Sequence, residues 1–256
     1  MAVLLLAYAV ARFIQVPGLN LSLNFAGVFI PLQIDIDTLI AVLVAGLTAT
    51  GTDWLLQSHP DLGQQRRLGH WLLPAMTAWV LTLPLANLPL SPFWWLVFAG
   101  SAALILTVLI AEYISVNHEN RLYAGASLAL SALAFGLFLI LAISLRAIGI
   151  RLVLILPTIA AAAFLVSARI HLLRSQTRWR WAQSLAIALL CAQIAAALHY
   201  LPLSAISFGL ALLGLLYALT IYAAALNGGQ RGREAANEPL VALGLFWGLA
   251  LLVNLL

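Results

Sequence analysis

Long runs of apolar residues, separated by short polar gaps, make up most of this chain of 256 residues. Hydrophobic residues account for 64% of the sequence and charged residues for 8%, whereas a soluble domain contains roughly 25% charged residues. A soluble fold of this length could not cover its surface with so few polar side chains. Lipid must therefore be the solvent for much of the chain.

Most of the apolar runs are long enough to cross a bilayer, which takes about 20 helical residues. The first run is short and contains Arg12, which fits a tilted span, an interfacial helix or a weak signal peptide. The sequence predicts an all-α transmembrane helix bundle of 8–9 spans, forming a single polytopic membrane domain over residues 1–256 with no soluble domain. The expected segments are 1–15, 38–56, 71–90, 93–116, 122–144, 150–171, 182–199, 204–226 and 239–256, and the polar stretch 227–238 is expected to be a flexible linker.

The stretch between the first two apolar runs has a different pattern. From Leu19 to Phe25 apolar residues alternate with Asn or Ser, and from Leu32 to Asp37 they alternate with Gln or Asp. Period-two alternation on both sides of a turn that contains Gly27 predicts a small β-hairpin over about residues 19–36, with an irregular loop as the alternative. Open strand edges cannot lie in hydrocarbon, so we expect this hairpin on the extracytoplasmic surface.

The positions of the arginines predict the orientation of the chain. The sequence contains no lysine, and nine of its twelve arginines lie in alternate gaps. Cytoplasmic loops carry such an excess of positive charge, so these gaps are expected in the cytoplasm and the C-terminus outside it. The nine are Arg66, Arg67, Arg121, Arg169, Arg174, Arg178, Arg180, Arg231 and Arg233, and the other three are Arg12, Arg146 and Arg151.

The composition also limits the classes of binding partner that we expect for this protein. The net charge of +4 does not form one basic face, because the arginines are dispersed over several gaps, so nucleic acid is not an expected partner. Membrane lipids are the expected partners, together with other membrane subunits if there are any. The single Cys191 lies in an apolar run, which excludes an intrachain disulfide or a thiolate metal cluster. The composition is typical of a bacterial multi-pass protein of the plasma membrane.

Two acidic residues lie inside apolar segments, near the predicted cytoplasmic ends: Asp53 and Glu112. Placing an ionisable group inside a membrane span costs free energy, so such a residue is a candidate for a functional role. A bundle could gather them with neighbouring groups into a polar pocket that holds a divalent metal or a phosphate. Solvation, or pairing with an arginine such as Arg169, is the alternative reading. The candidate cluster consists of Asp53, His59, Asp61, Glu112, His118, Arg169 and His171.

The spacing of these residues supports no particular chemistry. The sequence has no H-x-x-x-H or H-E-x-x-H motif, so no metal is assigned and no cofactor is expected. Ser127 and His199 are a candidate hydrolase pair, but they lie at opposite ends of their segments, too far apart for a nucleophile and its base. No catalytic residue is assigned, and whether the chain is an enzyme stays open.

Some further positions predict details of packing. Pro84 and Pro157 lie within apolar segments and are expected to kink or break them. Gly244 and Gly248 form a G-x-x-x-G pair that suits a close helix contact, although ordinary packing also explains it. Trp94 and Trp95 begin a segment and are expected to anchor it at the headgroup level.

The leading functional interpretation is a non-catalytic subunit, scaffold or lipid-interacting module in the membrane. The first alternative is a membrane enzyme that acts on a lipid-linked or phosphorylated substrate at the cytoplasmic face, and the second is a carrier for a neutral or apolar solute. A deep cavity lined by Asp53 and Glu112 would favour the enzyme. Broken helices around a mid-membrane cavity would favour the carrier, and an apolar groove would favour the subunit or lipid-binding module.

Overall fold

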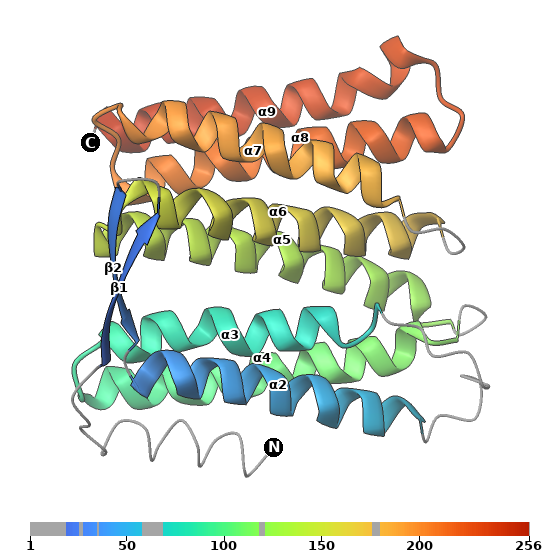
Figure 1. Ribbon diagram of the computed structural model, residues 1–256. Helices are drawn as coiled ribbons and strands as arrows, with labels where there is room; N and C mark the ends of the chain where they lie inside the picture. The colour runs from blue at the N-terminus through green and yellow to red at the C-terminus, as the bar shows by residue number, and fades with distance from the viewer. Residues whose placement is uncertain are drawn as a thin grey trace. The chain divides into compact units, whose positions relative to one another are not determined.

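The computed structural model describes residues 19–25, 28–34, 36–57, 69–117, 121–175 and 180–255. These residues form two strands and eight helices (Figure 1). The chain divides into two compact units, Met1–His118 and Glu119–Leu256, which we call unit 1 and unit 2. The first expected segment, residues 1–15, lies outside the described residues.

Unit 1 contains the two strands, β1 (Leu19–Phe25) and β2 (Val28–Ile34). They pair antiparallel, with Leu19 opposite Ile34 and Phe25 opposite Val28. The second strand begins before the alternating stretch and already ends at Ile34, because α2 begins at Ile36. On which side of the membrane these strands lie stays a prediction.

The described part of unit 1 also contains three helices: α2 (Ile36–Gln57), α3 (Leu72–Asn87) and α4 (Pro92–Ser115). Helix α3 packs against both of its neighbours. The shared core consists of buried residues from all three helices: Val44, Ala78, Leu81, Leu85, Trp94 and Ile105. That Trp94 and Trp95 anchor α4 at the headgroup level stays a prediction: Trp95 is 53% exposed, but Trp94 packs inside the unit. It is 2% exposed, stacks on Phe98 and donates its indole Nε1–H to the Leu85 carbonyl at 3.0 Å.

Unit 2 contains α5 (Tyr123–Ile148), α6 (Leu152–Ser175), α7 (Trp181–His199), α8 (Ala205–Asn227) and α9 (Gly232–Leu255). Helix α8 packs against each of the other four. Glycine makes two of these contacts possible, because a Cβ on Gly209 would meet Ile143 of α5 and a Cβ on Gly214 would meet Phe246 of α9, each at 2.6 Å. The absent side chains let the helices approach closely.

The G-x-x-x-G pair that the sequence suggested for helix contact is not used in this way. A Cβ added to Gly244 or to Gly248 would meet nothing within 4 Å. The prediction of a flexible linker over 227–238 was also wrong, because α9 begins at Gly232 and continues through Pro239. The segment contains Ala235, Ala236 and two glutamates, which favour a helix.

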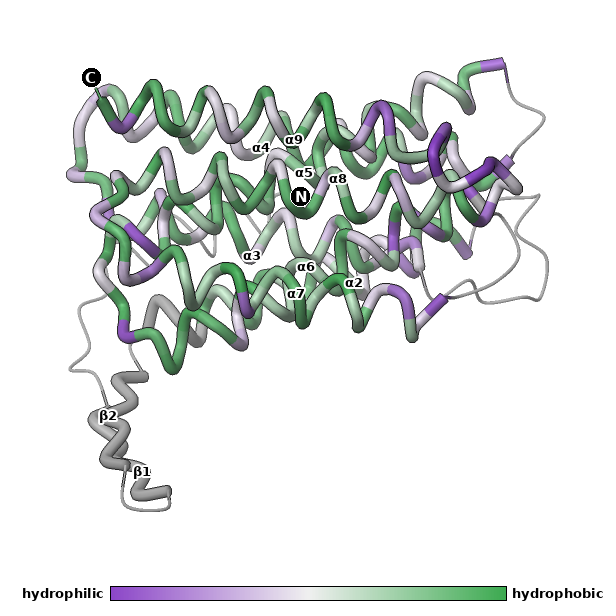
Figure 2. The backbone as a smooth tube through the Cα atoms, turned by 90° about the horizontal axis from the view of Figure 1, so that it is seen from above, coloured by the Kyte–Doolittle hydropathy of each residue, from purple (hydrophilic) through white to green (hydrophobic). Residues whose placement is uncertain are grey.

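Seven helices are long and apolar enough to cross a membrane: α2 and α4–α9. Helix α3 is apolar but has 16 residues, which is shorter than a usual span. The described chain therefore shows seven spanning helices by length and composition, not the expected eight or nine. Figure 2 shows that the middles of the helices are apolar and that the hydrophilic residues gather towards their ends.

Helix α3 is short because of a proline in its first turn. The Pro74 ring would clash with the carbonyl of residue 70 if the helix continued towards the N-terminus, so the helix starts at Leu72. His70 consequently lies in the preceding turn. Pro84 and Pro157, in contrast, each lie within a helix that continues past them.

We predict that Gly214→Ala destabilises the protein by about 1–3 kcal/mol, because the new methyl group overpacks the contact between α8 and α9. The atom it meets is Phe246 Cβ, which cannot move without its backbone. Gly244→Ala is the matched control on α9, and its higher helix propensity should stabilise by up to about 1 kcal/mol. Apparent melting temperatures in detergent check both, and equal behaviour of the two variants would contradict the predicted contact.

Candidate functional site

The candidate cluster is only partly within the described residues. His59, Asp61 and His118 lie outside them. Of the other four, Asp53 and Glu112 belong to unit 1, whereas Arg169 and His171 belong to unit 2. Among the described residues, no group of three His, Cys, Asp or Glu side chains comes together as a metal site would require.

Glu112 is fully buried in unit 1 and has a histidine partner. Its Oε2 atom lies 2.8 Å from Nδ1 of His70, whose side chain is 7% exposed. A carboxylate accepts hydrogen bonds, so this geometry fits an imidazole that donates from Nδ1. The Ser115 hydroxyl donates to the Glu112 backbone carbonyl at 2.9 Å. The predicted pairing of Glu112 with Arg169 would join the two units and stays a prediction.

His70 as the partner of Glu112 was not predicted from the sequence. The two residues are 42 positions apart, and hydropathy gives no information about such a pair. Pro74 was the available signal, because a proline in the first turn of α3 keeps His70 out of the helix, beside the end of α4.

Asp53 lies on α2, one turn before the end of the helix, and is partly exposed. It accepts a hydrogen bond of 2.6 Å from the side-chain amide of Gln57. A carboxylate bonded to a neighbour one turn away, at a partly exposed position, is an ordinary arrangement at a helix end.

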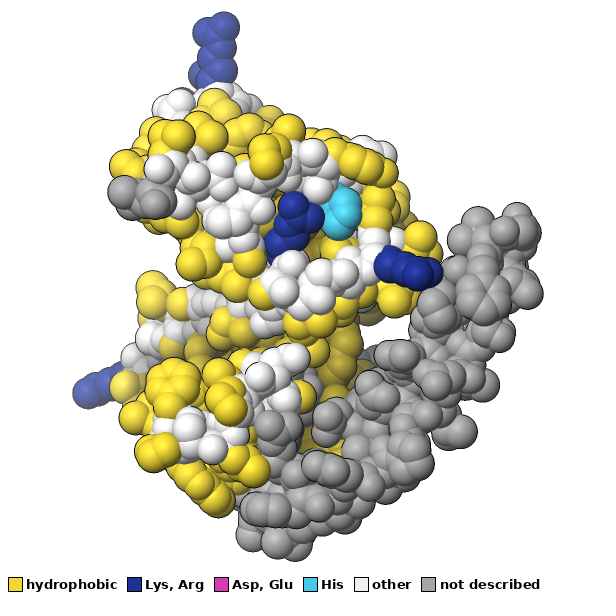
Figure 3. Space-filling model, turned by 90° about the vertical axis from the view of Figure 1, so that its left-hand side faces the viewer, with side chains coloured by type: hydrophobic (Ala, Val, Ile, Leu, Met, Phe, Trp, Pro, Cys, Tyr) yellow, Lys and Arg dark blue, Asp and Glu magenta, His cyan; other side chains and the backbone are white. Residues whose placement is uncertain are grey.

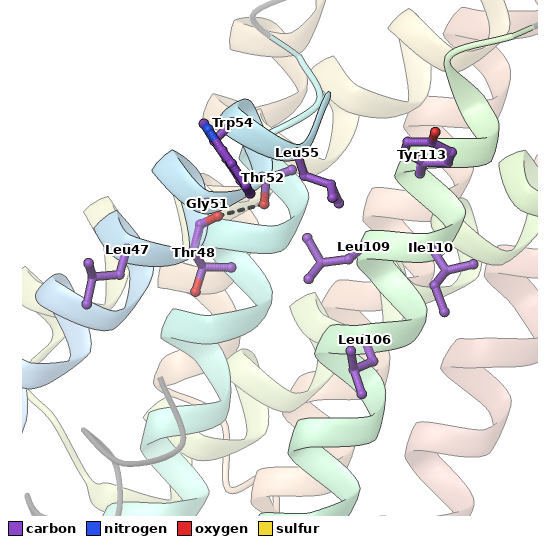
Figure 4. Close-up of a pocket in the computed structure, with 10 residues that line it drawn as sticks. All are labelled: Leu47, Thr48, Gly51, Thr52, Trp54, Leu55, Leu106, Leu109, Ile110 and Tyr113. Atoms are coloured by element: carbon purple, nitrogen blue, oxygen red, sulfur yellow. Dashed lines mark hydrogen bonds between the residues drawn. The ribbon is translucent and has the colours of Figure 1, made fainter. Parts of the chain in front are cut away.

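Unit 1 contains a groove between α2 and α4, with a volume of about 700 Å³ (Figure 4). Asp53 and Glu112 do not line it, although their sequence neighbours do. The hydroxyls of Thr48 and Thr52 donate to the backbone carbonyls of Val44 and Thr48, at 2.7 and 2.6 Å. The groove is therefore apolar in its chemistry. Its walls are Leu47, Thr48, Gly51, Thr52, Trp54 and Leu55 from α2, and Leu106, Leu109, Ile110 and Tyr113 from α4.

A basic cluster lies in unit 2, where α6 ends and α7 begins. Arg169 and His171 are buried on α6, each 2% exposed. The guanidinium groups of Arg174 and Arg180 lie within electrostatic range of the His171 imidazole. Because consecutive helices of unit 2 alternate in direction, Arg121, Arg231 and Arg233 belong to this same end of the unit.

The opposite end of unit 2 carries Arg146 and Arg151. Arg146 donates to the backbone carbonyls of His199 and Leu201 at 3.2 and 3.3 Å, and it lies 3.1 Å from His199 Nδ1. Since a guanidinium only donates, Nδ1 must accept, which places the imidazole proton on Nε2. Arg146 therefore satisfies carbonyls at the C-terminal end of α7. Figure 3, a view of the helix ends on the left of Figure 1, shows arginine and histidine side chains together on a largely apolar surface.

Seven apolar helices with the length of membrane spans make this a helical membrane protein. The chain belongs to the family described as a protein of unknown function (DUF5656), whose family model matches residues 16–253. No curated protein and no solved structure matches it.

We predict that Glu112→Ala lowers the free energy of unfolding by about 3–5 kcal/mol, because it removes one member of a buried, hydrogen-bonded pair. His70→Ala should cost a similar amount. The double variant should be less damaging than the sum of the two, because the residues share one interaction. Melting curves in detergent measure all three. Asp53→Ala, at a partly exposed position, is the control and should change stability by less than about 1 kcal/mol. Additive losses for Glu112 and His70 would show that they do not act as a pair.

Proposed function

We propose that this protein is a non-catalytic lipid-binding module of the membrane, and that the groove between α2 and α4 holds the acyl chain of a membrane lipid. The observation that carries this proposal is the chemistry of the groove. Aliphatic side chains supply most of its walls, and its two threonine hydroxyls are already bonded to backbone carbonyls. Such a surface offers little to a polar ligand and suits a hydrocarbon chain.

The aromatic residues of the groove support a lipid as its occupant. Trp54 and Tyr113 lie towards the C-terminal ends of α2 and α4, and Figure 4 shows them at the same end of the groove. Tryptophan and tyrosine favour the headgroup level of a bilayer. Leu47 and Leu106 are about 10 Å deeper along their helices. An acyl chain would therefore enter between the aromatic rings and run along the aliphatic walls.

The same geometry gives less support to the two alternatives. An enzyme would be favoured by a cavity lined by Asp53 and Glu112, but the lining of the groove contains neither of them. A carrier would be favoured by broken helices, whereas Pro84 and Pro157 lie inside continuous ones. The lipid-binding module is accordingly the function that we retain.

We further propose a topology for the chain in the plasma membrane of a bacterium. In this proposal α3 and residues 1–15 complete eight or nine spans of one polytopic domain. The arginine-rich end of unit 2 faces the cytoplasm, whereas the strands β1 and β2 and the C-terminus lie outside it. The distribution of arginine supports the orientation. Arg146 does not weaken this argument, because its bonds to backbone carbonyls account for its position at the opposite end.

We predict that Gly51→Phe reduces the amount of lipid that remains bound after purification in mild detergent. Gly51 lines the groove, and a Cβ at this position would meet nothing within 4 Å, so a larger side chain can fill the groove without a clash in the chain. Native mass spectrometry measures the lipid that stays bound. A second measurement adds a lipid with a photoreactive acyl chain and locates its crosslinks in the protein. We expect crosslinking to α2 and α4 in the unmodified protein and a loss of several-fold in the variant.

Gly46→Phe is the matched control, because Gly46 lies on the same helix, has equally open surroundings and does not line the groove. It should bind lipid as the unmodified protein does. Equal crosslinking in both variants would overturn the proposed occupant. Crosslinks from a terminal segment or a second copy of the chain, formed in place of lipid crosslinks, would identify a different one.

We predict that a cysteine at position 174 is protected from a membrane-impermeant reagent in intact cells, whereas one at position 151 is labelled. Both arginines are exposed and lie at opposite ends of unit 2. The test uses Arg174→Cys and Arg151→Cys, with Cys191→Ser as the background, since Cys191 is the single native cysteine. Labelling only at position 174 would reverse the proposed orientation.

A further inference from the structure

Helix α9 packs one face against α8 and leaves the opposite face uncovered. Only 11% of its most apolar stretch is buried inside the protein, compared with 56% for α8. Its buried residues, Ala235, Pro239 and Ala250, share one side of the helix. Successive residues are about 100° apart around a helix, so a second set lies on the opposite side, and every member of it is exposed. This set, which we call the free face of α9, consists of Asn237, Val241, Gly244, Gly248, Leu251 and Leu255.

The middle of the free face has no side chains. Gly244 and Gly248 lie there, and a Cβ added to either would meet nothing within 4 Å. Glycine lowers the stability of a helix relative to alanine, and no neighbouring helix among the described residues makes use of these two, as α9 does of Gly214 on α8. Two glycines one turn apart do, however, allow a helix from outside the unit to approach closely.

The polar end of the free face is complementary to itself. Arg233 and Glu234 are both exposed, and they lie on either side of the free face at the level of Asn237. The other acidic residue of α9, Glu238, is instead bonded to the Tyr217 hydroxyl of α8 at 3.0 Å. Positive charge therefore lies to one side of the free face and negative charge to the other.

The orientation of the chain decides how two such faces can meet. Copies of a membrane protein insert with the same orientation, so two α9 helices lie parallel and are related by a two-fold axis along the membrane normal. This axis sets each side of one free face against the other side of its copy. Arg233 then faces Glu234 of the partner subunit in two equivalent ion pairs. The two Asn237 amides meet at the axis, where they can exchange hydrogen bonds.

We propose that the free face of α9 is the interface of a homodimer and that its occupant is a second copy of this chain. The charges carry the choice of occupant, since they match across a two-fold axis. The tails of membrane lipids can cover the leucines of this face, but hydrocarbon offers no hydrogen-bond partner to Asn237. The interface lies wholly in unit 2 and does not depend on the acyl-chain groove of unit 1.

Disulfide crosslinking of the full chain in its membrane tests the interface. In a Cys191→Ser background, a single introduced cysteine can form a disulfide only with a second copy. Val241→Cys places it on the free face. Leu189→Cys is the matched control, at an exposed apolar position of α7 and at a similar distance from the start of its helix. We expect a dimer from position 241 and little from position 189. Equal yields from both positions would overturn the proposal, and no dimer from position 241 would leave lipid as the occupant and overturn it too.

A large side chain in the middle of the free face should prevent the close approach of the second copy. Gly248→Leu is expected to raise the dissociation constant of the dimer in liposomes roughly tenfold or more, as overpacking of one contact does. Energy transfer between labelled copies measures this constant. The melting temperature in detergent should not fall, because the new side chain meets nothing in its own chain. Gly125→Leu, at an exposed glycine of α5 with equally open surroundings, is the control and should associate as the unmodified protein does. Unchanged association of Gly248→Leu would contradict the interface.

Exchange of the two charges tests the two-fold arrangement itself. Arg233→Glu and Glu234→Arg should each weaken association several-fold, because each places like charges opposite one another. The double variant restores opposite charges across the axis and should recover association, a result that a loss of folding could not produce. Single variants that associate as the unmodified protein does, or a double variant no better than either of them, would overturn the proposal.

Discussion

Hydrocarbon offers no hydrogen-bond partner, and most of the polar chemistry of this structure follows from that constraint. Hydroxyl groups along the helices donate to carbonyls one turn earlier, as Thr48, Thr52 and Thr158 do. Where a donor cannot reach its own helix it reaches a neighbouring one, as the indole of Trp247 does when it donates to the Ala211 carbonyl at 3.2 Å. The result is a set of helices whose polar side chains are mostly satisfied internally. The groove between α2 and α4 follows the same rule, since its two threonine hydroxyls are bonded to backbone carbonyls and leave an apolar surface.

The same constraint decides where charge is tolerated. Arg146 is acceptable at the arginine-poor end of unit 2 because it donates to carbonyls that the end of α7 leaves exposed. Glu112 is acceptable at 0% exposure because His70 lies 2.8 Å away. In both cases a charged group is fixed by a partner far from it in the sequence. The number of arginines in each gap indicates the orientation of the chain as a whole. A single arginine at the opposite end, such as Arg146, is explained by its local hydrogen-bond partners.

Hydropathy alone located every helix from α2 to α9, since a span is a local property of about 20 residues. Hydropathy did not predict the contacts between helices, because these depend on which face of a helix meets its neighbour. Gly244 and Gly248 have the spacing of a contact motif but open surroundings, whereas Gly209 and Gly214 make the close approaches. For the candidate site, the sequence singled out Glu112 as an acidic residue inside an apolar segment, with solvation or pairing left open, and it did not identify His70 as the partner. The groove could not be foreseen either, because it depends on the relative lengths of three helices.

Those lengths explain why the groove exists. Helix α3 has 16 residues and α4 has 24, a difference of about 12 Å of helix rise. Because α3 runs from its start at Leu72 back towards the α3–α4 turn, the last turns of α4 extend beyond the start of α3. Of the groove residues on α4, Leu109, Ile110 and Tyr113 lie on this extension. Pro74 lies in the first turn of α3, and the start of the helix at Leu72 places His70 beside Glu112. The buried pair and the apolar groove thus lie at the same end of unit 1, near the end of α4, and Glu112 does not line the groove.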